Sequence, residues 1–166
     1  MTKRYSRTSR LVTSALMVLS ALLSGCVQTR YSPPTTPIFD KLIIPGERIG
    51  PISLGMPQAD VLKILGTPPK SSIHTDGHSR YYYADLTVFI SRDSRVLRIL
   101  TNSPEYATAG GIRVGMTEPE VRAKLGKPKS VIDPGSSLLW YTYGSALEIC
   151  FDRSKGNRII DITIAE

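Results

Sequence analysis

The sequence is poor in the side chains on which most catalytic and metal sites depend. Its 166 residues include only two cysteines and two histidines. No Ser-His-Asp order, paired-carboxylate motif, phosphate-binding glycine loop or Cys-His pair stands out along the chain. We therefore expect a protein that is not an enzyme and that uses no cofactor.

The two histidines leave one alternative open. His74 and His78 flank Asp76 in the stretch HTDGH, a pattern that can supply ligands to zinc or copper. The Asp76-Gly77 pair also favours a turn in a polar surface loop. We favour the loop and expect no metal, and a metal-binding or enzymatic role for His74 and His78 is the alternative.

An apolar run long enough to cross a membrane is also missing from the N-terminal region. The stretch from Leu11 to Leu23 is shorter than the roughly 20 residues that a membrane-spanning helix needs. Four basic residues and no acidic one precede it, and the small residues Ser24 and Gly25 follow it. This order is typical of a secretory signal, so we interpret residues 1–25 as a signal peptide.

The end of this signal is more specific than an ordinary cleavage site. Leu23-Ser24-Gly25-Cys26 resembles a bacterial lipobox. The resemblance implies that the thiol of Cys26 accepts a diacylglyceryl group and that Cys26 becomes the first residue of the mature protein. An ordinary signal peptide with an incidental cysteine is the alternative.

The second cysteine, Cys150, lies in the apolar stretch LEICF. If Cys26 carries lipid, Cys150 has no partner within the chain and is most simply a small buried residue. If Cys26 is not lipidated, a disulfide between Cys26 and Cys150 is the alternative.

The basic charge of the chain comes largely from the signal peptide. The formal net charge is +7, from 21 basic and 14 acidic residues. Residues 1–25 hold four basic residues and no acidic one, so the mature chain has 17 basic and 14 acidic residues, a formal charge of +3. Such a mild charge gives little support for nucleic-acid binding, and we expect no nucleic-acid partner.

Residues 26–45 are expected to form a tether between the lipid and a folded domain. Pro33, Pro34 and Pro37 disfavour both a regular helix and a central strand. Three acyl chains on Cys26 would anchor the protein stably, since one chain alone binds only marginally. Val27 follows Cys26 where aspartate would favour the inner membrane, which resembles the enterobacterial pattern for the outer membrane. We expect a lipid-anchored protein of the bacterial envelope, in the outer membrane and facing the periplasm.

One segment of the remaining chain recurs later with a similar sequence. ISLGMPQADVLKILGTP, residues 52–68, returns 60 positions later as IRVGMTEPEVRAKLGKP, residues 112–128. In the second copy Thr117 is a good helix N-cap, and Glu120 completes a capping box. Gly126 then stands where a left-handed helix end is favoured. We predict a short helix in each copy.

The first copy lacks the threonine cap. Pro57 stands in its place and offers no side-chain hydrogen bond, so we expect this helix to begin less securely. Met56 and Val61 have the spacing of a hydrophobic staple, as do Met116 and Val121 in the second copy.

Alternating apolar residues follow each helix and predict antiparallel strands. Leu86, Val88 and Ile90 match Leu147, Ile149 and Phe151. The predicted fold class is α+β, with two tandem repeats, residues 46–104 and 105–166, each a short helix followed by a three-stranded antiparallel β-meander. Because each repeat is too small to be stable alone, the two are expected to share a sheet or a core.

The frame G-M-T-x-x-x-V-x-x-x-L-G-x-P, complete from Gly115 to Pro128, resembles the SmpA/OmlA (BamE-like) family of outer-membrane lipoproteins. The tandem arrangement is similar to the β-lactamase inhibitor protein-like fold. The resemblance covers most of residues 49–166 and implies that fold and a place in the envelope. This chain departs from the family in carrying two units, and Pro45, Gly46, Gly50 and Pro51 argue against a helix before the first Gly-Met.

Two clusters of aromatic residues are candidates for a partner surface. Tyr81, Tyr82 and Tyr83 follow Arg80, and the matching strand of the second repeat holds Trp140, Tyr141 and Tyr143. Strand alternation cannot place all of them on one face, so some are expected to point outward, where tyrosine, tryptophan and arginine favour protein binding. Coverage of the sheet by the tether or the other repeat is the alternative. The candidate contact residues are Arg80, Tyr81, Tyr83, Trp140 and Tyr141.

These observations predict a membrane-tethered, non-enzymatic binding or scaffold protein of the envelope, accessory to outer-membrane assembly. Its partner would be another envelope protein. The alternative is a periplasmic lipoprotein that inhibits an enzyme such as a β-lactamase, a lysozyme or a protease, as the similar inhibitor fold implies.

Overall fold

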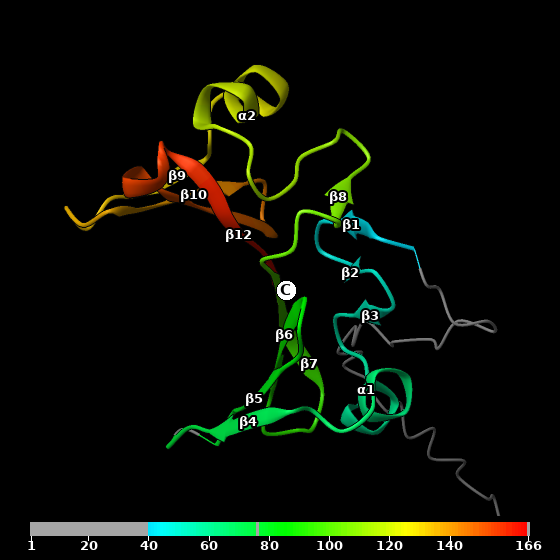
Figure 1. Cartoon of the computed structure of the whole chain (residues 1–166). Coiled ribbons are helices and arrows are strands. Elements are labelled where there is room, and N and C mark those ends of the chain that lie inside the picture. Colours follow the sequence, from blue (N-terminus) through cyan, green and yellow to red (C-terminus); the bar gives the residue numbers. More distant parts are fainter. Residues whose placement is uncertain (1–39, 76, 166) are drawn as a thin grey trace, which may run out of the picture.

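The computed structural model describes residues 40–75 and 77–165, and these residues are folded mainly as β-strands. Within this part of the chain, twelve strands form one sheet of eight and one of four, accompanied by two α-helices and one short 3-10 helix (Figure 1). The expected α+β fold of two repeats, each with a helix and three strands, is therefore wrong. No helix in the described ranges has the length and apolar character needed to span a membrane.

The large sheet follows the chain in two runs that meet in its middle. The strand order is β4-β5-β6-β7-β12-β11-β10-β9. The first run comprises α1 (Gln58–Leu65), β4 (Lys70–Ile73), β5 (Ser79–Tyr82), β6 (Leu86–Ile90) and β7 (Val96–Thr101). The second comprises α2 (Glu118–Leu125), β9 (Ser130–Ile132), β10 (Leu138–Tyr143), β11 (Leu147–Asp152), the 3-10 helix η1 (Arg153–Lys155) and β12 (Arg158–Ala165). Each run therefore has one strand more than the sequence predicted.

The small sheet is built from the segments before each helix. Its order is β3-β2-β1-β8, with β1 (Leu42–Ile44), β2 (Arg48–Ile49), β3 (Ile52–Ser53) and β8 (Ala107–Thr108). Strand β1 pairs in parallel with β8 and antiparallel with β2. The end of the predicted tether at residue 45 is therefore wrong, because residues 42–44 already belong to the fold.

The entry of the chain into the small sheet is fixed by charge pairs. Asp40 binds the guanidinium of Arg48 through both carboxylate oxygens, at 2.7 and 2.9 Å. Arg48 also donates to the carbonyl of Gly50 at 2.8 Å, so its nearly buried charge is well compensated. Any tether to the membrane therefore joins the domain at a defined point, next to Asp40.

The strands that the sequence analysis missed are short or polar. Strand β4 reads KSSI and β9 reads SVI, and both lie at edges of the large sheet with their residues mostly exposed. Their residues lack the apolar alternation of a half-buried strand, which is the pattern by which strands are recognised. The strands of the small sheet have only two or three residues each, too few to show any period.

The repeated Gly-Met pair attaches each helix to the large sheet. In the first half the N–H of Gly55 donates to Val96 at 2.8 Å, and the N–H of Val96 donates to Met56 at 2.9 Å. The N–H of Gln58, at the start of α1, donates to the carbonyl of Ser94 in the β6–β7 turn at 2.9 Å. The motif thus pairs with the turn like a short extra strand.

The second half repeats this attachment bond for bond. Gly115 donates to Ile159 at 2.9 Å, Ile159 donates to Met116 at 2.8 Å, and Glu118 donates to Asn157 at 3.1 Å. Ser94 and Asn157, which accept from the two helix starts, are the two described non-glycine residues with positive φ, at 56° and 54°. The recurrence in the sequence therefore encodes a helix–hairpin junction rather than a catalytic motif.

The two helices are as the sequence predicted, residues 58–65 and 118–125. Glu120 accepts a hydrogen bond from the backbone N–H of Thr117 at 2.7 Å, the return half of a capping box. Pro57 provides no side-chain bond to α1. One residue of each helix, Val61 or Val121, is completely buried, so packing on the sheet rather than helix propensity holds these short helices in place.

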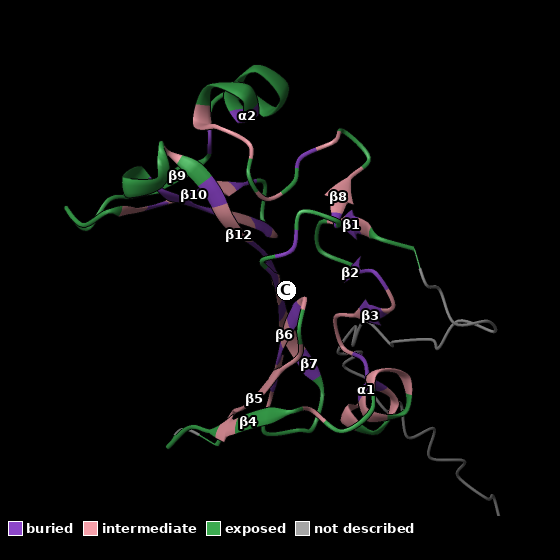
Figure 2. Ribbon diagram, in the orientation of Figure 1, coloured by how far each residue is buried: buried purple, intermediate pink, exposed green. Residues whose placement is uncertain are grey.

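The core lies between one face of the large sheet and a layer made of the helices and the small sheet. Figure 2 shows buried residues along the central strands and the small sheet, and exposed residues along β4 and β9. The side chains that are at most 1% exposed include Ile43, Ile49, Ile52, Met56, Val61, Val88, Ile99, Val121, Ile149, Phe151, Ile162 and Ile164. Burying each of these larger apolar side chains contributes about 1.5–3 kcal/mol, which offsets the cost of ordering the chain.

Gly115 gives a direct test of the junction. Its φ is +93°, and a Cβ built there meets nothing within 4 Å, so Gly115→Ala would be strained only in its backbone. We expect this substitution to lower the free energy of unfolding by about 1–2 kcal/mol, measured by urea denaturation. Gly110→Ala is the matched control, because Gly110 has no positive φ and a Cβ there would contact only Thr108 at 3.8 Å. If the two substitutions lowered the free energy of unfolding equally, the proposed role of Gly115 in the junction would be contradicted.

Candidate functional site

The five candidate contact residues do not lie on one surface. Tyr141 is only 4% exposed and packs edge-on against Phe151, with 5.1 Å between ring centroids. Tyr81 and Tyr83 pack against the same core as half-buried residues. These three placements correct the prediction: Tyr81, Tyr83 and Tyr141 stabilise the fold on the core side. Arg80 and Trp140 alternate with them and point to the other side of the sheet.

The side of the sheet opposite the core is called the inner face here, and the strand register defines it. Residues directly opposed across antiparallel strands point to the same side. One row across the strands runs Lys70, Tyr82, Thr87, Leu100, Thr163, Glu148, Thr142 and Ser130. A second runs Ser72, Arg80, Phe89, Arg98 and Ala165, and a third runs Asp161, Cys150, Trp140 and Ile132.

Neither helix and no strand of the small sheet lies over the inner face in Figure 1, although Thr163 and Cys150 in its middle are buried, 5% and 1% exposed. Figure 1 shows the two halves of the large sheet meeting at an angle, with α1, α2 and the small sheet on the outer side of the bend. The inner face therefore lines the inside of the bend, where Phe89, Leu100, Leu138 and Trp140 are half-buried. Ile132, at its edge, is 58% exposed. Aromatic residues, aliphatic residues and arginine on one uncovered surface are the composition of protein-binding patches.

Charge on the inner face is divided between the two halves of the sheet. The first half supplies the cations Lys70, Arg80 and Arg98, and the second supplies the carboxylates of Glu148 and Asp161. Arg98 and Glu148 meet across the boundary at 3.5 Å, with about two fifths of each side chain exposed (42% and 39%). Such an exposed pair contributes little to stability, so both groups can exchange partners.

Asp161 is the carboxylate of this face whose pKa burial raises. Burial raises its pKa from 3.8 to about 6, and the nearby charge of Glu148 adds to the rise. The folded state therefore holds a proton that the unfolded chain releases between about pH 4 and pH 6. The stability that this proton contributes is complete below the unfolded pKa and is lost as the pH rises through about 6.

Cys150 lies beside Asp161, and its thiol is unreactive. Its side chain is 1% exposed, and burial raises the pKa of its thiol to about 12. A buried, protonated thiol is a poor nucleophile and a poor metal ligand. The structure thus agrees with a small buried residue. Cys26, the predicted lipid attachment site, lies outside the described residues, so the alternative disulfide between the two cysteines is not tested.

The histidine stretch forms the turn between β4 and β5. The N–H of His74 donates to the carbonyl of His78 at 2.8 Å. Asp76, the third member of the H-x-D-x-H pattern, is outside the described residues. Within residues 40–75 and 77–165 no group of three or more histidine, cysteine, aspartate or glutamate side chains is arranged to hold a metal ion.

A polar network on the core side of the second half was not predicted. Glu118, in the first turn of α2, accepts hydrogen bonds from Tyr141 at 2.5 Å, from Arg122 at 2.6 Å and from Asn157 at 2.8 Å. The bond from Tyr141 is the main cause that lowers the pKa of Glu118. These groups stand far apart in the sequence, and only the i, i+4 spacing of Glu118 and Arg122 gave a sequence signal. The network ties α2 to β10 and to the β11–β12 turn.

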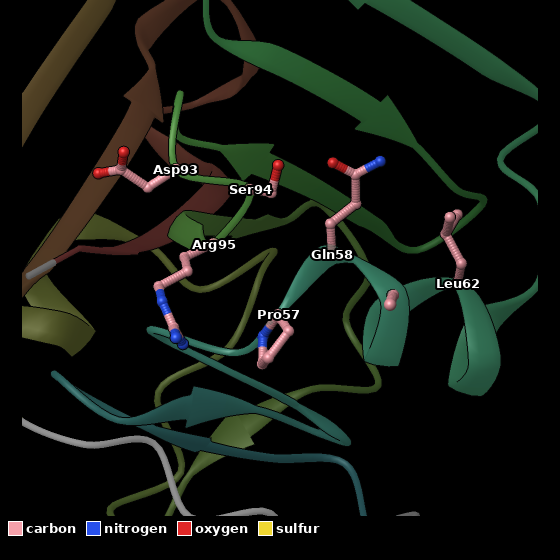
Figure 3. Close-up of a pocket in the computed structure, with 7 residues that line it drawn as sticks. Pro57, Gln58, Leu62, Asp93, Ser94 and Arg95 are labelled. Atoms are coloured by element: carbon pink, nitrogen blue, oxygen red, sulfur yellow. The ribbon is translucent and has the colours of Figure 1, made fainter.

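The equivalent position in the first half is occupied by different side chains. Gln58, Leu62 and Ser94 correspond to Glu118, Arg122 and Asn157, and no buried carboxylate network forms among them. A hollow of about 440 Å³ lies there, lined by Pro57, Gln58, Ala59, Leu62, Asp93, Ser94 and Arg95. Figure 3 shows Gln58 of α1 next to Ser94 of the turn, while the Asp93 carboxylate points away from the helix. Since Arg95 already donates to the carbonyl of Gly55 at 2.9 Å, we do not assign a ligand to this hollow.

No protein-family model matches the chain, and no curated protein matches it. Among solved structures, an extracellular protein containing a SCP domain from Bacillus anthracis aligns with 68% of this chain and 44% of its own, with 9% identity and a TM-score of 0.48. The chain thus spans less than half the length of that protein. The uncharacterized protein yfeY from Escherichia coli aligns with 74% of this chain and 95% of its own, with 13% identity and a TM-score of 0.48.

A DUF4309 family protein (YjgB) from Bacillus subtilis aligns with 65% of this chain and 77% of its own, with 16% identity and a TM-score of 0.45. These likenesses are weak, and no function follows from them.

The pKa of Asp161 gives a prediction with a defined sign. Because its ionised form is disfavoured in the folded protein, Asp161→Asn is expected to raise the free energy of unfolding at pH 8 by about 1–2 kcal/mol and to change it little at pH 4. Urea denaturation at the two pH values measures the effect. Asp93→Asn, in the exposed β6–β7 turn, is the control and should behave alike at both. A gain at pH 4 that equals the gain at pH 8 would contradict the assignment.

Proposed function

We propose that this protein is a non-enzymatic, lipid-anchored binding module of the bacterial envelope, and that another envelope protein docks on its inner face. The observation that carries the proposal is the inner face itself: a sheet surface with Phe89, Trp140, Arg80 and Arg98 over which neither helix and no strand of the small sheet lies. Folded proteins rarely leave such a surface unused.

The sequence supports the location. The lipobox-like Leu23-Ser24-Gly25-Cys26 and the proline-rich residues that follow would tether the domain to a membrane. The Gly115–Pro128 frame, which resembles that of the SmpA/OmlA lipoproteins, favours the outer membrane and an accessory role in its assembly. The described part of the chain begins at Asp40, on the small-sheet side and away from the inner face.

Two groups of polar or titratable side chains in the described residues are candidate reaction centres, and neither is arranged for catalysis, which favours a binding role. Among the described residues, the buried thiol of Cys150 is held protonated, and the polar network around Glu118 is fully engaged in fixing α2. Neither arrangement offers a nucleophile and a base within reach of one bound substrate.

Position-specific cross-linking in cells tests the proposal. A photo-reactive phenylalanine analogue placed at Trp140 or at Tyr82, on the two halves of the inner face, should cross-link the same envelope protein. The analogue at Ala123, an exposed position on α2, is the matched control and should not. The physical reason is that only inner-face positions lie within the contact surface.

Two results would contradict the proposal. One is cross-linking at Ala123 that equals that at Trp140, and the other is no cross-linked partner at either inner-face position. A recovered partner that is a hydrolase, slowed by the purified protein, would favour the inhibitor alternative over an assembly role. A cross-link only within the chain, to residues 27–39, would mean that the tether covers the face.

A further inference from the structure

The first half of the inner face carries a compact group of cations stacked on aromatic rings. The guanidinium of Arg80 lies over the ring of Phe89, 4.6 Å from its centroid, and that of Arg98 lies 6.0 Å from the same centroid. The ammonium of Lys70 lies 5.4 Å from the ring of Tyr82. These five residues, Lys70, Arg80, Tyr82, Phe89 and Arg98, are called the cationic patch below.

Arg80 is the member of the patch that has a buried nitrogen without an acceptor. Its Nε has no hydrogen-bond partner, and within the described residues its guanidinium makes one hydrogen bond, a long contact of 3.5 Å from Nη1 to the Tyr82 hydroxyl. No ion pair joins it to any carboxylate in the described part of the chain. By contrast, Arg48, Arg122 and Arg153 each meet a carboxylate, at 2.7, 2.6 and 2.5 Å. A guanidinium that meets no carboxylate of its own chain is a candidate donor to a carboxylate supplied by another molecule.

The stacking prepares Arg80 to bind a carboxylate. The cation–π contact holds the Arg80 guanidinium at the Phe89 ring, and the N–H donors of a guanidinium form a planar fork. That fork matches the two oxygens of a carboxylate, and the stacking has already restricted the side chain that must be ordered on binding. Arg98 is available beside it, because its own pair with Glu148 is exposed and weak.

We propose that the cationic patch is the docking point for a carboxylate-bearing segment of the protein partner, an exposed loop or strand rich in aspartate or glutamate, with Arg80 as the anchor. The inference rests on the proposed function, because it assigns a chemistry to the partner of the inner face. Three cations on β4, β5 and β7 supply the charge complementarity, and Phe89 and Leu100 on β6 and β7 supply apolar contact around it.

The position of the patch favours a protein segment over an anionic membrane surface. The strand register places the patch on the inner face, and Figure 1 shows that this side of the large sheet is the inside of its bend. A flat array of lipid headgroups cannot follow that bend, whereas a protruding loop can. Across the boundary, Glu148 and Asp161 would repel a surface of uniform negative charge.

The test uses the full chain in a mild non-ionic detergent and an acetylated, amidated hexaglutamate peptide as the probe. The Nε–Hε signals of the arginines, followed by NMR at low ionic strength, report binding at each guanidinium. We expect the peptide to shift the signal of Arg80, then that of Arg98. Arg80→Gln should weaken binding about tenfold or more, as the loss of a charge-assisted pair does. Arg80→Lys should rescue it only in part, because lysine keeps the charge but lacks the fork.

Arg113→Gln is the matched control, since Arg113 is exposed and lies on the chain between the small sheet and α2. It removes the same charge and should leave binding unchanged within about twofold. The proposal is overturned if the peptide fails to bind, or if the Arg80 and Arg113 variants lose binding equally. It is also overturned if inorganic phosphate, or micelles doped with phosphatidylglycerol, shift Arg80 as strongly as the peptide does.

The two proposals fail separately. If the Trp140 cross-link to an envelope protein persists undiminished in cells that carry Arg80→Gln, the inner face still binds a partner and the acidic segment is wrong. If the hexaglutamate peptide binds at Arg80 but no partner cross-links at the inner face, the patch recognises carboxylates and the proposed function is wrong.

Discussion

The pairing of β7 with β12 is the interaction on which the rest of the structure depends. Thr101 opposes Ile162 and Ile99 opposes Ile164 across this seam, and the four side chains are completely buried. The seam joins two four-stranded runs into one sheet and gives their helices a common core. Without it, each run would expose an edge strand and about half of the core, too little to offset the entropy of ordering so short a chain. The inner face exists only because the seam makes the sheet continuous.

The two halves share their junctions but differ in what surrounds them. The Gly-Met pair attaches each helix to its hairpin through the same backbone bonds, so the repeated glycine and methionine are explained by geometry. The second half then secures α2 with the carboxylate of Glu118, whereas the first half places Leu62 and Gln58 there. The two halves thus share the same backbone junction. Their side chains differ, which makes the inner face basic in one half and acidic in the other.

Sequence patterns located the features that local chemistry controls. The helices at residues 58–65 and 118–125 follow from their caps, glycine ends and single buried faces, and the alternation of Leu86, Val88 and Ile90 marks a real strand. The same alternation would have identified Phe89 as an inner-face residue, since it lies between two buried neighbours. Strands β4 and β9 were missed because edge strands have one free side and little to bury.

The side on which each aromatic residue lies could not be read from the sequence. In the run Arg80-Tyr81-Tyr82-Tyr83, neighbouring side chains point to opposite faces of the sheet. Which of them face the core is decided by the pairing of Tyr81 with Val88. The stack of Arg80 and Arg98 on Phe89 joins three strands, and the Glu118 network joins residues 39 positions apart. Such contacts between distant positions arise from the register of the sheet, which no local pattern specifies.

Native-state hydrogen exchange across the β7–β12 seam tests this account most directly. If the seam holds the two halves together, the amides of β7, β12 and their neighbours β6 and β11 should exchange most slowly, with one common free energy equal to that of global unfolding. Amides of the edge strands β4 and β9 should exchange faster by local opening. The account is contradicted if the amides of one half open together at a lower free energy while those of the other half stay protected, because the halves would then fold independently.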